Sequence, residues 1–252
     1  MQCLELLVQG LSLGMILGGV IHFVCLLKSH AAYGRYVDAS TDSVMVPARL
    51  AWFLQEIPAL LGPLLLLLIT DGNQGYKEQL MLWIFCLHYF NRSCIYPLRT
   101  KGRPYPFSIM LSGIVFCSIN GFLQAHYLLH CAKYQDGWLS DGHFIAGLMI
   151  LFIGMAINIH SDHILCNLRK PGEISYKIPT GGLFQYVSGA NYFGEIVEWL
   201  GYAVATWSLP TFAFAFFTIC FIGPRAYHHH RFYMEKFKDF PRSRRSLIPF
   251  IF

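Results

Sequence analysis

Two side chains within apolar stretches of the sequence could act as neutral hydrogen-bond donors. Glu56 lies in the segment WFLQEIP at residues 52–58, and Tyr89 lies in FCLHYF at residues 85–90. A carboxyl group in such surroundings is desolvated, which favours its protonated, hydrogen-bond-donating form. A tyrosine hydroxyl can donate to a carbonyl oxygen. Structural roles are the alternatives: Glu56 could pair with Arg49, and Tyr89 could be an interfacial aromatic residue.

Further polar side chains recur at helical spacing, three or four residues apart, so that they share a helix face. One such face carries Tyr89, Arg92 and Tyr96; the others carry Asn158, Asp162, Cys166 and Arg169; Asn191, Glu195, Glu198 and Tyr202; and Arg225, His229 and Tyr233. Ionisable groups at membrane depth are costly and are therefore candidates for function. Each face alone could serve interhelical hydrogen bonding. Together, converging Arg, Lys, Tyr and Asn residues suit an anionic small molecule such as a dinucleotide.

Aromatic residues accompany these polar groups in the same segments. They are Trp52, Phe116, Tyr192, Trp199, Phe214, Phe216, Phe217 and Phe221. Most are expected to pack or to face lipid, and some could line an apolar slot for a flat hydrophobic ligand.

The composition indicates that lipid surrounds the elements carrying these residues. The chain has 252 residues, of which 55% are hydrophobic and 13% charged, whereas a soluble domain carries roughly 25% charged residues. A span needs about 20 mainly apolar residues. We predict an all-α, polytopic membrane protein with seven transmembrane helices, at residues 4–27, 51–70, 79–96, 107–129, 144–166, 191–208 and 211–224. The last helix is expected to continue through Tyr233.

The distribution of basic residues predicts the orientation of these helices. Of the 19 Lys and Arg residues, only Lys77 and Lys133 fall on one side of the predicted membrane. The positive-inside rule therefore places the N-terminus in the lumen and the basic C-terminal tail in the cytosol. The first apolar segment has no basic region before it, so we expect a retained helix and not a cleaved signal peptide.

Other features of the chain favour a single membrane-embedded domain, residues 1–252. Its eight cysteines are scattered, which is typical of buried thiols and not of a disulfide framework. The net charge of +5 comes from Lys and Arg residues in the loops between spans, so we expect no nucleic-acid partner. We also expect no obligate protein partner. Since no Gly-x-Gly-x-x-Gly fingerprint follows a predicted strand, a bound nucleotide must be held by the membrane domain itself.

Two other functions fit part of this pattern. The pairs His126/His130 and His160/His163 and the run at residues 228–230 have spacings that can bind metal. On the predicted topology, however, the first pair lies about 30 Å of bilayer away from the others. A seven-span receptor fits the topology, but the polar groups open toward the cytosol, and no receptor motif such as Asp-Arg-Tyr occurs. We therefore favour an enzyme without a metal.

Seven motifs resemble the steroid 5α-reductase family (3-oxo-5α-steroid 4-dehydrogenases), most closely its vertebrate type 2 members. The motifs are PAR (47–49), AWFLQE (51–56), FCLHYF (85–90), RPYP (103–106), NIHSD (158–162), RKPGEISY (169–176) and YHHHRFY (227–233). The resemblance covers nearly the whole chain. It implies a seven-helix, multi-pass enzyme of the endoplasmic reticulum that uses NADPH to reduce 3-oxo-Δ4 steroids such as testosterone or progesterone. A relative that reduces another conjugated lipid, a sterol or an enoyl thioester, is the alternative.

The resemblance also implies roles for individual residues. Glu56 and Tyr89 would contact the steroid 3-oxo group and stabilise the enolate that forms when hydride reaches C5. The cofactor-binding positions would be Tyr33, Arg92, Tyr96, Arg103, Asn158, Asp162, Arg169, Tyr176, Lys177, Asn191, Glu195, Arg225, His229 and Tyr233. The expected steroid-binding residues are Trp52, Phe116, Tyr192, Phe214, Phe217 and Phe221. Two residues depart from the family pattern, because Lys177 and Ser112 stand where arginine is expected. The steroid would enter from the bilayer and NADPH from the cytosol.

Overall fold

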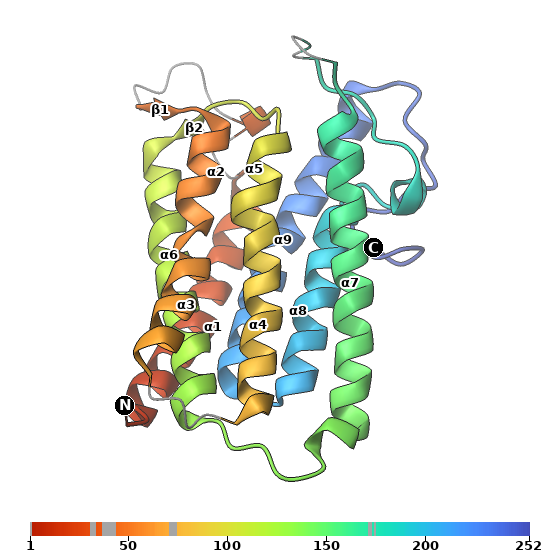
Figure 1. Ribbon diagram of the computed structural model, residues 1–252. Coiled ribbons are helices and arrows are strands. Elements are labelled where there is room, and N and C mark those ends of the chain that lie inside the picture. Colours follow the sequence, from red (N-terminus) through yellow and green to blue (C-terminus); the bar gives the residue numbers. More distant parts are fainter. Residues whose placement is uncertain (1, 31–33, 37–43, 71–74, 171–172, 174) are drawn as a thin grey trace. The chain divides into compact units, whose positions relative to one another are not determined.

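The chain folds almost entirely into helices (Figure 1). The computed structural model describes residues 2–30, 34–36, 44–70, 75–170, 173 and 175–252. The α-helices within these residues are α1 (Glu5–Lys28), α2 (Ala48–Glu56), α3 (Pro58–Ile69), α4 (Tyr76–Phe90), α5 (Tyr96–Arg99), α6 (Phe107–His126), α7 (Gly142–Asn167), α8 (Ala190–Thr206) and α9 (Leu209–Lys236). Strand β1 (Met45–Val46) pairs with β2 (Tyr105–Pro106) in antiparallel register. The all-α prediction is therefore confirmed.

Five helical stretches are long and apolar enough to cross a membrane. They are Glu5–Lys28, Ala48–Ile69, Phe107–Cys131, Gly142–Asn167 and Leu209–Lys236, and they coincide with five of the predicted spans. The predicted span at 79–96 falls on α4, a π-helical turn (Asn91–Ile95) and α5, and the one at 191–208 falls on α8, which has 17 residues. Neither of these two segments is among the helical stretches that are long and apolar enough to cross a membrane, so the count of seven spans stays a prediction.

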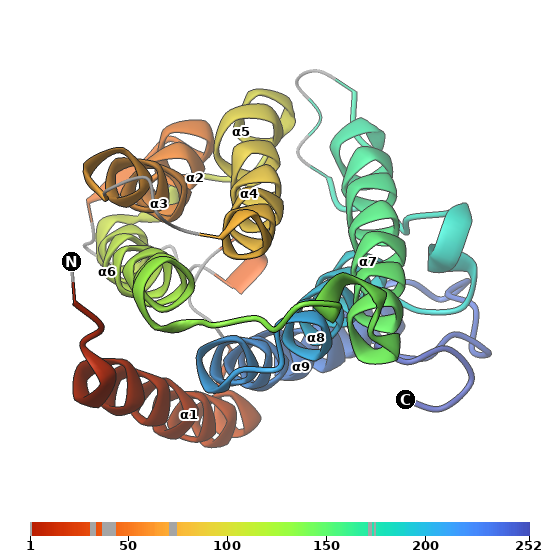
Figure 2. The same cartoon turned by 60° about the horizontal axis from the view of Figure 1, so that its bottom comes forward.

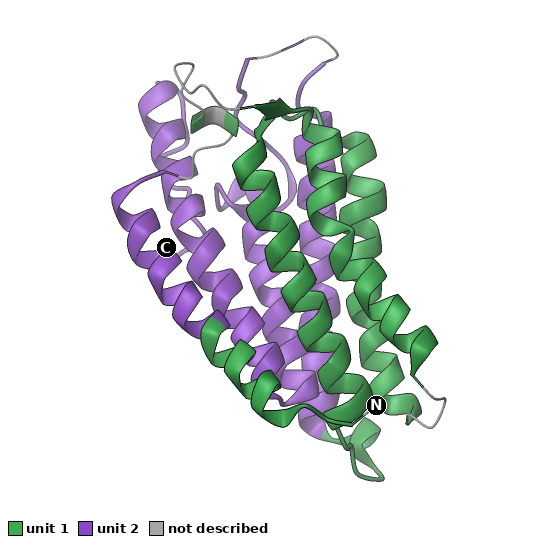
Figure 3. Ribbon diagram, turned by 90° about the vertical axis from the view of Figure 1, so that its left-hand side faces the viewer, with its two compact units in different colours: residues 1–14, 32–141 green, residues 15–31, 142–252 purple. Residues whose placement is uncertain are grey.

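The chain divides into two compact units, which Figure 3 colours separately. The first unit contains Met1–Gly14 and Ala32–Asp141, and thus α2 to α6. The second contains Met15–Ala31 and Gly142–Phe252, and thus α7 to α9. Helix α1 contributes residues to both.

In the first unit, α3 lies beside α6 and α4 (Figure 2). Helix α2 ends at Glu56 and α3 begins at Pro58, because proline lacks the backbone N–H that would continue the helical ladder. Gly121 of α6 permits the close approach to α3, since a Cβ atom there would lie 2.9 Å from the Cα of Ala59. The break between α2 and α3 and the close contact between α3 and α6 together determine the position of Glu56 along α6.

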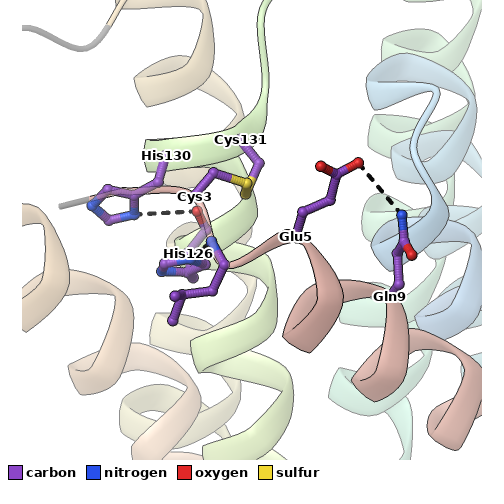
Figure 4. Close-up of a disulfide and its surroundings, with 7 residues drawn as sticks. Cys3, Glu5, Gln9, His126, His130 and Cys131 are labelled. Carbon is purple, nitrogen blue, oxygen red and sulfur yellow. Dashed lines mark hydrogen bonds between the residues drawn. A yellow bond between two sulfur atoms is a disulfide. The ribbon is translucent and has the colours of Figure 1, made fainter.

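One end of the first unit is joined by a disulfide and several polar contacts (Figure 4). Cys3 and Cys131 form the disulfide across 128 residues of sequence. The backbone N–H of Leu4 donates to His126 Nε2 at 3.1 Å, and His130 Nε2 lies 3.3 Å from the Thr70 hydroxyl. The expectation that the cysteines are free thiols is wrong for this pair. Sequence spacing did not reveal the disulfide, because folding alone brings the N-terminus to the end of α6.

In the second unit, α8 lies between α7 and α9 (Figure 2). Glycines set the distance between α7 and α8: Gly147 and Gly154 on α7, and Gly194 and Gly201 on α8, recur at seven-residue intervals. A Cβ at Gly154 would overlap the backbone nitrogen of Glu198, and one at Gly194 would lie 2.9 Å from the Cα of Asn158. The two backbones therefore touch, as at small-residue interfaces of membrane helices.

The substitution Gly154→Ala should destabilise the fold, because the added methyl group meets backbone atoms that cannot rotate away. We expect a cost on the order of 1–3 kcal/mol, as for overpacked cores, measured as a lower midpoint of thermal unfolding in detergent. Gly62→Ala is the matched control: its Cβ meets nothing within 4 Å, and alanine favours a helix over glycine. An unchanged midpoint for Gly154→Ala would contradict the close packing of α7 on α8.

The disulfide predicts a specific count of reactive thiols. In denatured, unreduced protein, a maleimide–polyethylene glycol reagent should modify six cysteines, and after reduction all eight. Cys3→Ser should free Cys131 and give seven without reduction, and should lower the unfolding free energy by about 2–5 kcal/mol. Cys25→Ser, at an exposed free thiol, should leave stability unchanged. Modification of all eight cysteines in the unreduced parent chain would refute the disulfide.

Candidate active site

Glu56 lies at the break between α2 and α3, where its carboxylate group meets α6. Its Oε1 accepts a hydrogen bond from Gln55 Nε2 at 3.1 Å, and its Oε2 lies 3.6 Å from Cys117 Sγ. Glu56 is half-buried, whereas Gln55 is buried. Glu56 thus bonds the neighbouring amide of its own helix and contacts the Cys117 thiol of α6.

Tyr89, from α4, contacts the same face of α6. Its side chain is buried, and its hydroxyl oxygen accepts a hydrogen bond from Asn120 Nδ2 at 3.2 Å. Asn120 Oδ1 in turn accepts from Gln124 Nε2 at 3.1 Å. Because Cys117, Asn120 and Gln124 are three and four residues apart, they share one face of α6. The structure therefore brings both predicted catalytic residues to that face.

Directly after Tyr89, the helix changes to the π-helical turn Asn91–Ile95. The Ser93 hydroxyl donates to the carbonyl oxygen of Tyr89 at 2.6 Å, which satisfies one backbone group of the irregular turn. Single π turns within helices are frequent at functional sites. This turn directs Arg92 inward, so that its guanidinium carbon lies 5.0 Å from the ring centroid of Trp52 and 4.9 Å from that of Tyr96.

Arg92, Trp52 and Tyr96 therefore form one cluster in the first unit. Arg92 is buried, and the two rings that its guanidinium contacts meet edge to face with centroids 5.1 Å apart. Aromatic faces attract a desolvated cation, and an anionic group could approach the same cation. Arg103 is exposed in the segment before β2, and Phe116 is half-buried on α6.

In the second unit, amide and carboxylate groups of α7 and α8 are joined by hydrogen bonds. Asn158 Nδ2 donates to the backbone oxygen of Asn191 at 3.0 Å, and Asn191 Nδ2 donates to Asp162 Oδ1 at 3.2 Å. Asn158 and Asp162 are buried. The glycine contacts between the two helices lie in the same turns, so the close approach of the backbones makes these bonds possible. Glu195 is half-buried one turn further along α8.

Helix α9 carries three of the residues predicted to bind the cofactor, namely Arg225, His229 and Tyr233. The Arg225 guanidinium lies 3.7 Å from the ring centroid of Phe221. His229 and Tyr192 have ring centroids 5.6 Å apart. Tyr233 is buried and stacks on Phe240. Arg225, His229 and Tyr233 are spaced four residues apart and therefore share one side of α9.

The loop after α7 supplies a second group of charged residues. Arg169 lies 5.7 Å from the ring centroid of Tyr176, which also contacts Lys236 of α9. Lys177 donates to Glu173 at 2.7 Å, and this hydrogen bond holds the pKa of the Glu173 carboxyl below its usual range. Tyr33, a further predicted cofactor residue, lies outside the described residues.

The remaining predicted steroid-binding residues lie in the second unit. Phe214 is buried, with its ring 4.5 Å from that of Trp199. Phe217 and Phe221 stack with centroids 5.6 Å apart, and both contact His22 of α1. Phe214 and Phe217 are both buried, and Phe217 and Phe221 form a pair of stacked rings on α9 that contacts α1.

The residues that link Glu56 and Tyr89 to α6 were not predicted. They are Gln55, Cys117, Asn120 and Gln124. Two amides four residues apart in an apolar segment were a usable signal, because both must face protein and not lipid. Glu198 was recognised only as part of a polar face; it is fully buried beside Gly154.

Comparisons with known proteins agree with the motifs. The sequence profile of the family described as 3-oxo-5-alpha-steroid 4-dehydrogenase matches residues 103–252. The chain is 51% identical to 3-oxo-5-alpha-steroid 4-dehydrogenase 2 of Macaca fascicularis, over 94% of this chain and 92% of the relative. It is 54% identical to the Homo sapiens protein of that name, over 88% of both chains. Identity to 3-oxo-5-alpha-steroid 4-dehydrogenase 1 of Homo sapiens is 48%, over 89% of this chain and 88% of the relative.

Proposed function

This chain belongs to the 3-oxo-5-alpha-steroid 4-dehydrogenase family, and from that membership and the geometry of its polar residues we propose that it reduces the Δ4 double bond of 3-oxo-Δ4 steroids with NADPH. Residues 1–252 would act as one reductase domain. Testosterone, giving 5α-dihydrotestosterone, and progesterone are the expected substrates.

The observation that carries this proposal is the shared face of α6. Cys117 contacts Glu56, and Asn120 contacts Tyr89, from positions three residues apart. Two groups that can each donate a hydrogen bond thus come from different helices to one buried face. A carbonyl oxygen placed there could be held by both groups in a site that excludes water, where such bonds are strongest.

The chemistry follows from the enone. Hydride addition at C5 breaks the Δ4 double bond, moves electrons toward the 3-oxo oxygen and creates an enolate, which a proton delivered to C4 converts to the saturated ketone. The Tyr89 hydroxyl and the protonated carboxyl of Glu56 would each donate a hydrogen bond to that oxygen. Both donors are neutral, so each can donate without carrying a buried charge of its own. Their bonds strengthen as negative charge grows on the oxygen, which lowers the transition state more than the bound substrate.

NADPH, when bound, supplies the hydride. The polar groups of the second unit fit a dinucleotide: the cations Arg169, Lys177 and Arg225 suit phosphates, and Asn158, Asp162, Asn191 and Glu195 can bond ribose hydroxyls and an amide. Tyr176, His229 and Tyr233 add rings and polar tips. In the first unit, we propose that Arg92, Tyr96 and Arg103 also bind NADPH. The proposed steroid-binding residues of that unit are Trp52 and Phe116. Tyr192, Phe214, Phe217 and Phe221 are the steroid candidates of the second unit.

The enzyme is proposed to be a multi-pass protein of the endoplasmic reticulum membrane. Segment 76–99, which contains α4 and α5, and helix α8 would complete seven spans together with the five apolar stretches. The disulfide Cys3–Cys131 supports a lumenal N-terminus, because disulfides persist in oxidising compartments. The excess of Lys and Arg in the opposite loops supports the same orientation. The steroid would then enter from lipid and NADPH from the cytosol.

Microsomes that express this chain should convert testosterone to dihydrotestosterone when supplied with NADPH, but much more slowly with NADH. The measurement is a product separation after incubation with NADPH, NADH or neither. Conversion with NADH at an equal rate would refute the cofactor assignment. Folded protein that binds NADPH but forms no product would refute the steroid substrate and direct the search to other conjugated lipids.

Glu56→Gln should lower kcat with testosterone by about 10²-fold, in the range typical for loss of one donor to a developing oxyanion. An amide has the same shape but is a far weaker acid, so folding should change little. Thermal unfolding of the same preparation checks this. Glu5→Gln is a control, since Glu5 is exposed and its carboxylate accepts a hydrogen bond from Gln9 of its own helix. Parental activity in Glu56→Gln would remove Glu56 from the mechanism.

A further inference from the structure

Two buried amides on α6 connect in series to the Tyr89 hydroxyl. Gln124 Nε2 donates to Asn120 Oδ1 at 3.1 Å, and Asn120 Nδ2 donates to the Tyr89 oxygen at 3.2 Å. Asn120 and Gln124 are both 0% exposed, and Tyr89 is 3% exposed. Water therefore does not reach the amides, and their bonds must be made within the protein.

A primary amide is directional, because one side donates and the other only accepts. With Gln124 donating to its oxygen, Asn120 must turn its NH₂ group toward Tyr89. The phenol oxygen then accepts, so the bond to Asn120 does not use the hydroxyl proton. If both amides were turned around, Asn120 would present its oxygen and Tyr89 would donate to it. The two orientations have the same shape but give Tyr89 opposite roles.

We propose that Asn120 and Gln124 are positioning residues that keep the Tyr89 hydroxyl a donor to the bound substrate. This inference rests on the proposed function, in which Tyr89 donates to the 3-oxo oxygen of the steroid. Hydrogen bonds in series polarise one another, so the bond from Asn120 also strengthens the one that Tyr89 donates. The amides touch no reacting atom; they act through Tyr89.

Gln124→Glu tests the direction of the hydrogen bonds from Gln124 through Asn120 to Tyr89, because a carboxyl group can either donate or accept. When protonated, its O–H donates to Asn120 Oδ1, as the Gln124 amide does. When ionised, it only accepts, so the Asn120 amide turns and Tyr89 donates to Asn120. We expect kcat of Gln124→Glu with testosterone to be near the parental value at low pH. It should fall by about 10²-fold as pH rises through the ionisation of the introduced carboxyl, while KM changes little.

The parent chain supplies the reference pH profile, because amides do not titrate. Among the described residues, the titratable groups that contact this face of α6 include Glu56 from α2 and Tyr89 from α4. They are present in both proteins, so a difference between the profiles comes from the introduced carboxyl. Ser118→Ala is the control on the same helix: the exposed Ser118 hydroxyl donates to the carbonyl oxygen of Ile114, and the pH profile of the variant should match that of the parent.

Tyr89→Phe separates this inference from the proposed function. Parental kcat in Tyr89→Phe would refute the role of Tyr89 itself. If Tyr89→Phe is impaired, adding Gln124→Glu to it should cause no further pH dependence, because the hydroxyl that the amides direct is gone. An impaired Tyr89→Phe together with a parental pH profile for the single Gln124→Glu variant would overturn the positioning role and leave the proposed function intact.

Asn120→Asp provides a second test that does not depend on the folding of Gln124→Glu. A carboxylate at this position can accept from both Gln124 and Tyr89, which uses the Tyr89 proton. We expect kcat to be about 10²-fold lower at high pH and to recover as the carboxyl is protonated, and at the pH of recovery the midpoint of thermal unfolding should match that of the parent. Parental kcat at every pH would overturn the inference.

Discussion

Polar side chains inside an apolar helical bundle must find their partners within the protein, because lipid offers none. An unsatisfied buried polar group costs several kcal/mol, and the candidate site is arranged around that constraint. In the first unit, one face of α6 contacts Glu56 from α2 and Tyr89 from α4. In the second unit, Asn158, Asp162 and Asn191 satisfy one another between α7 and α8. The groups assigned to chemistry are thus also the groups that fix how neighbouring helices pack.

Irregular backbone occurs where these polar groups lie. Pro58 ends the helical ladder directly after Glu56, and a π turn follows Tyr89 and contains Arg92. Each irregularity changes the direction in which the next side chain points, which a regular helix could not do. The glycines of α7 and α8 have a comparable role: they bring two backbones so close that an amide on one helix reaches a backbone carbonyl on the other. Local sequence features therefore set the geometry of both polar networks.

Much of the fold and part of the site could be predicted from the sequence. Apolar length identified the helices, and polar residues such as Glu56 and Asp162 identified the candidate site. The disulfide could not be predicted, because 128 residues separate Cys3 from Cys131 and only tertiary folding joins them. Asn120 and Gln124 were missed for a similar reason. Their importance depends on which helix faces α6, and helical periodicity says which residues share a face but not what that face touches.

The two departures from the family pattern differ in consequence for the same physical reason. Ser112 is exposed, and its hydroxyl donates to the carbonyl oxygen of Ile109 in its own helix, so it is satisfied away from the candidate site. Lys177 pairs with Glu173, itself in the loop after α7. A lysine ammonium is a compact point charge, whereas arginine presents a planar fork that can bind a carboxylate and a phosphate in bidentate fashion. Lysine at this position therefore keeps a positive charge but lacks the planar fork of arginine. Under the proposed function, the directional contacts to the cofactor would come from the amides of Asn158 and Asn191 and from Arg225.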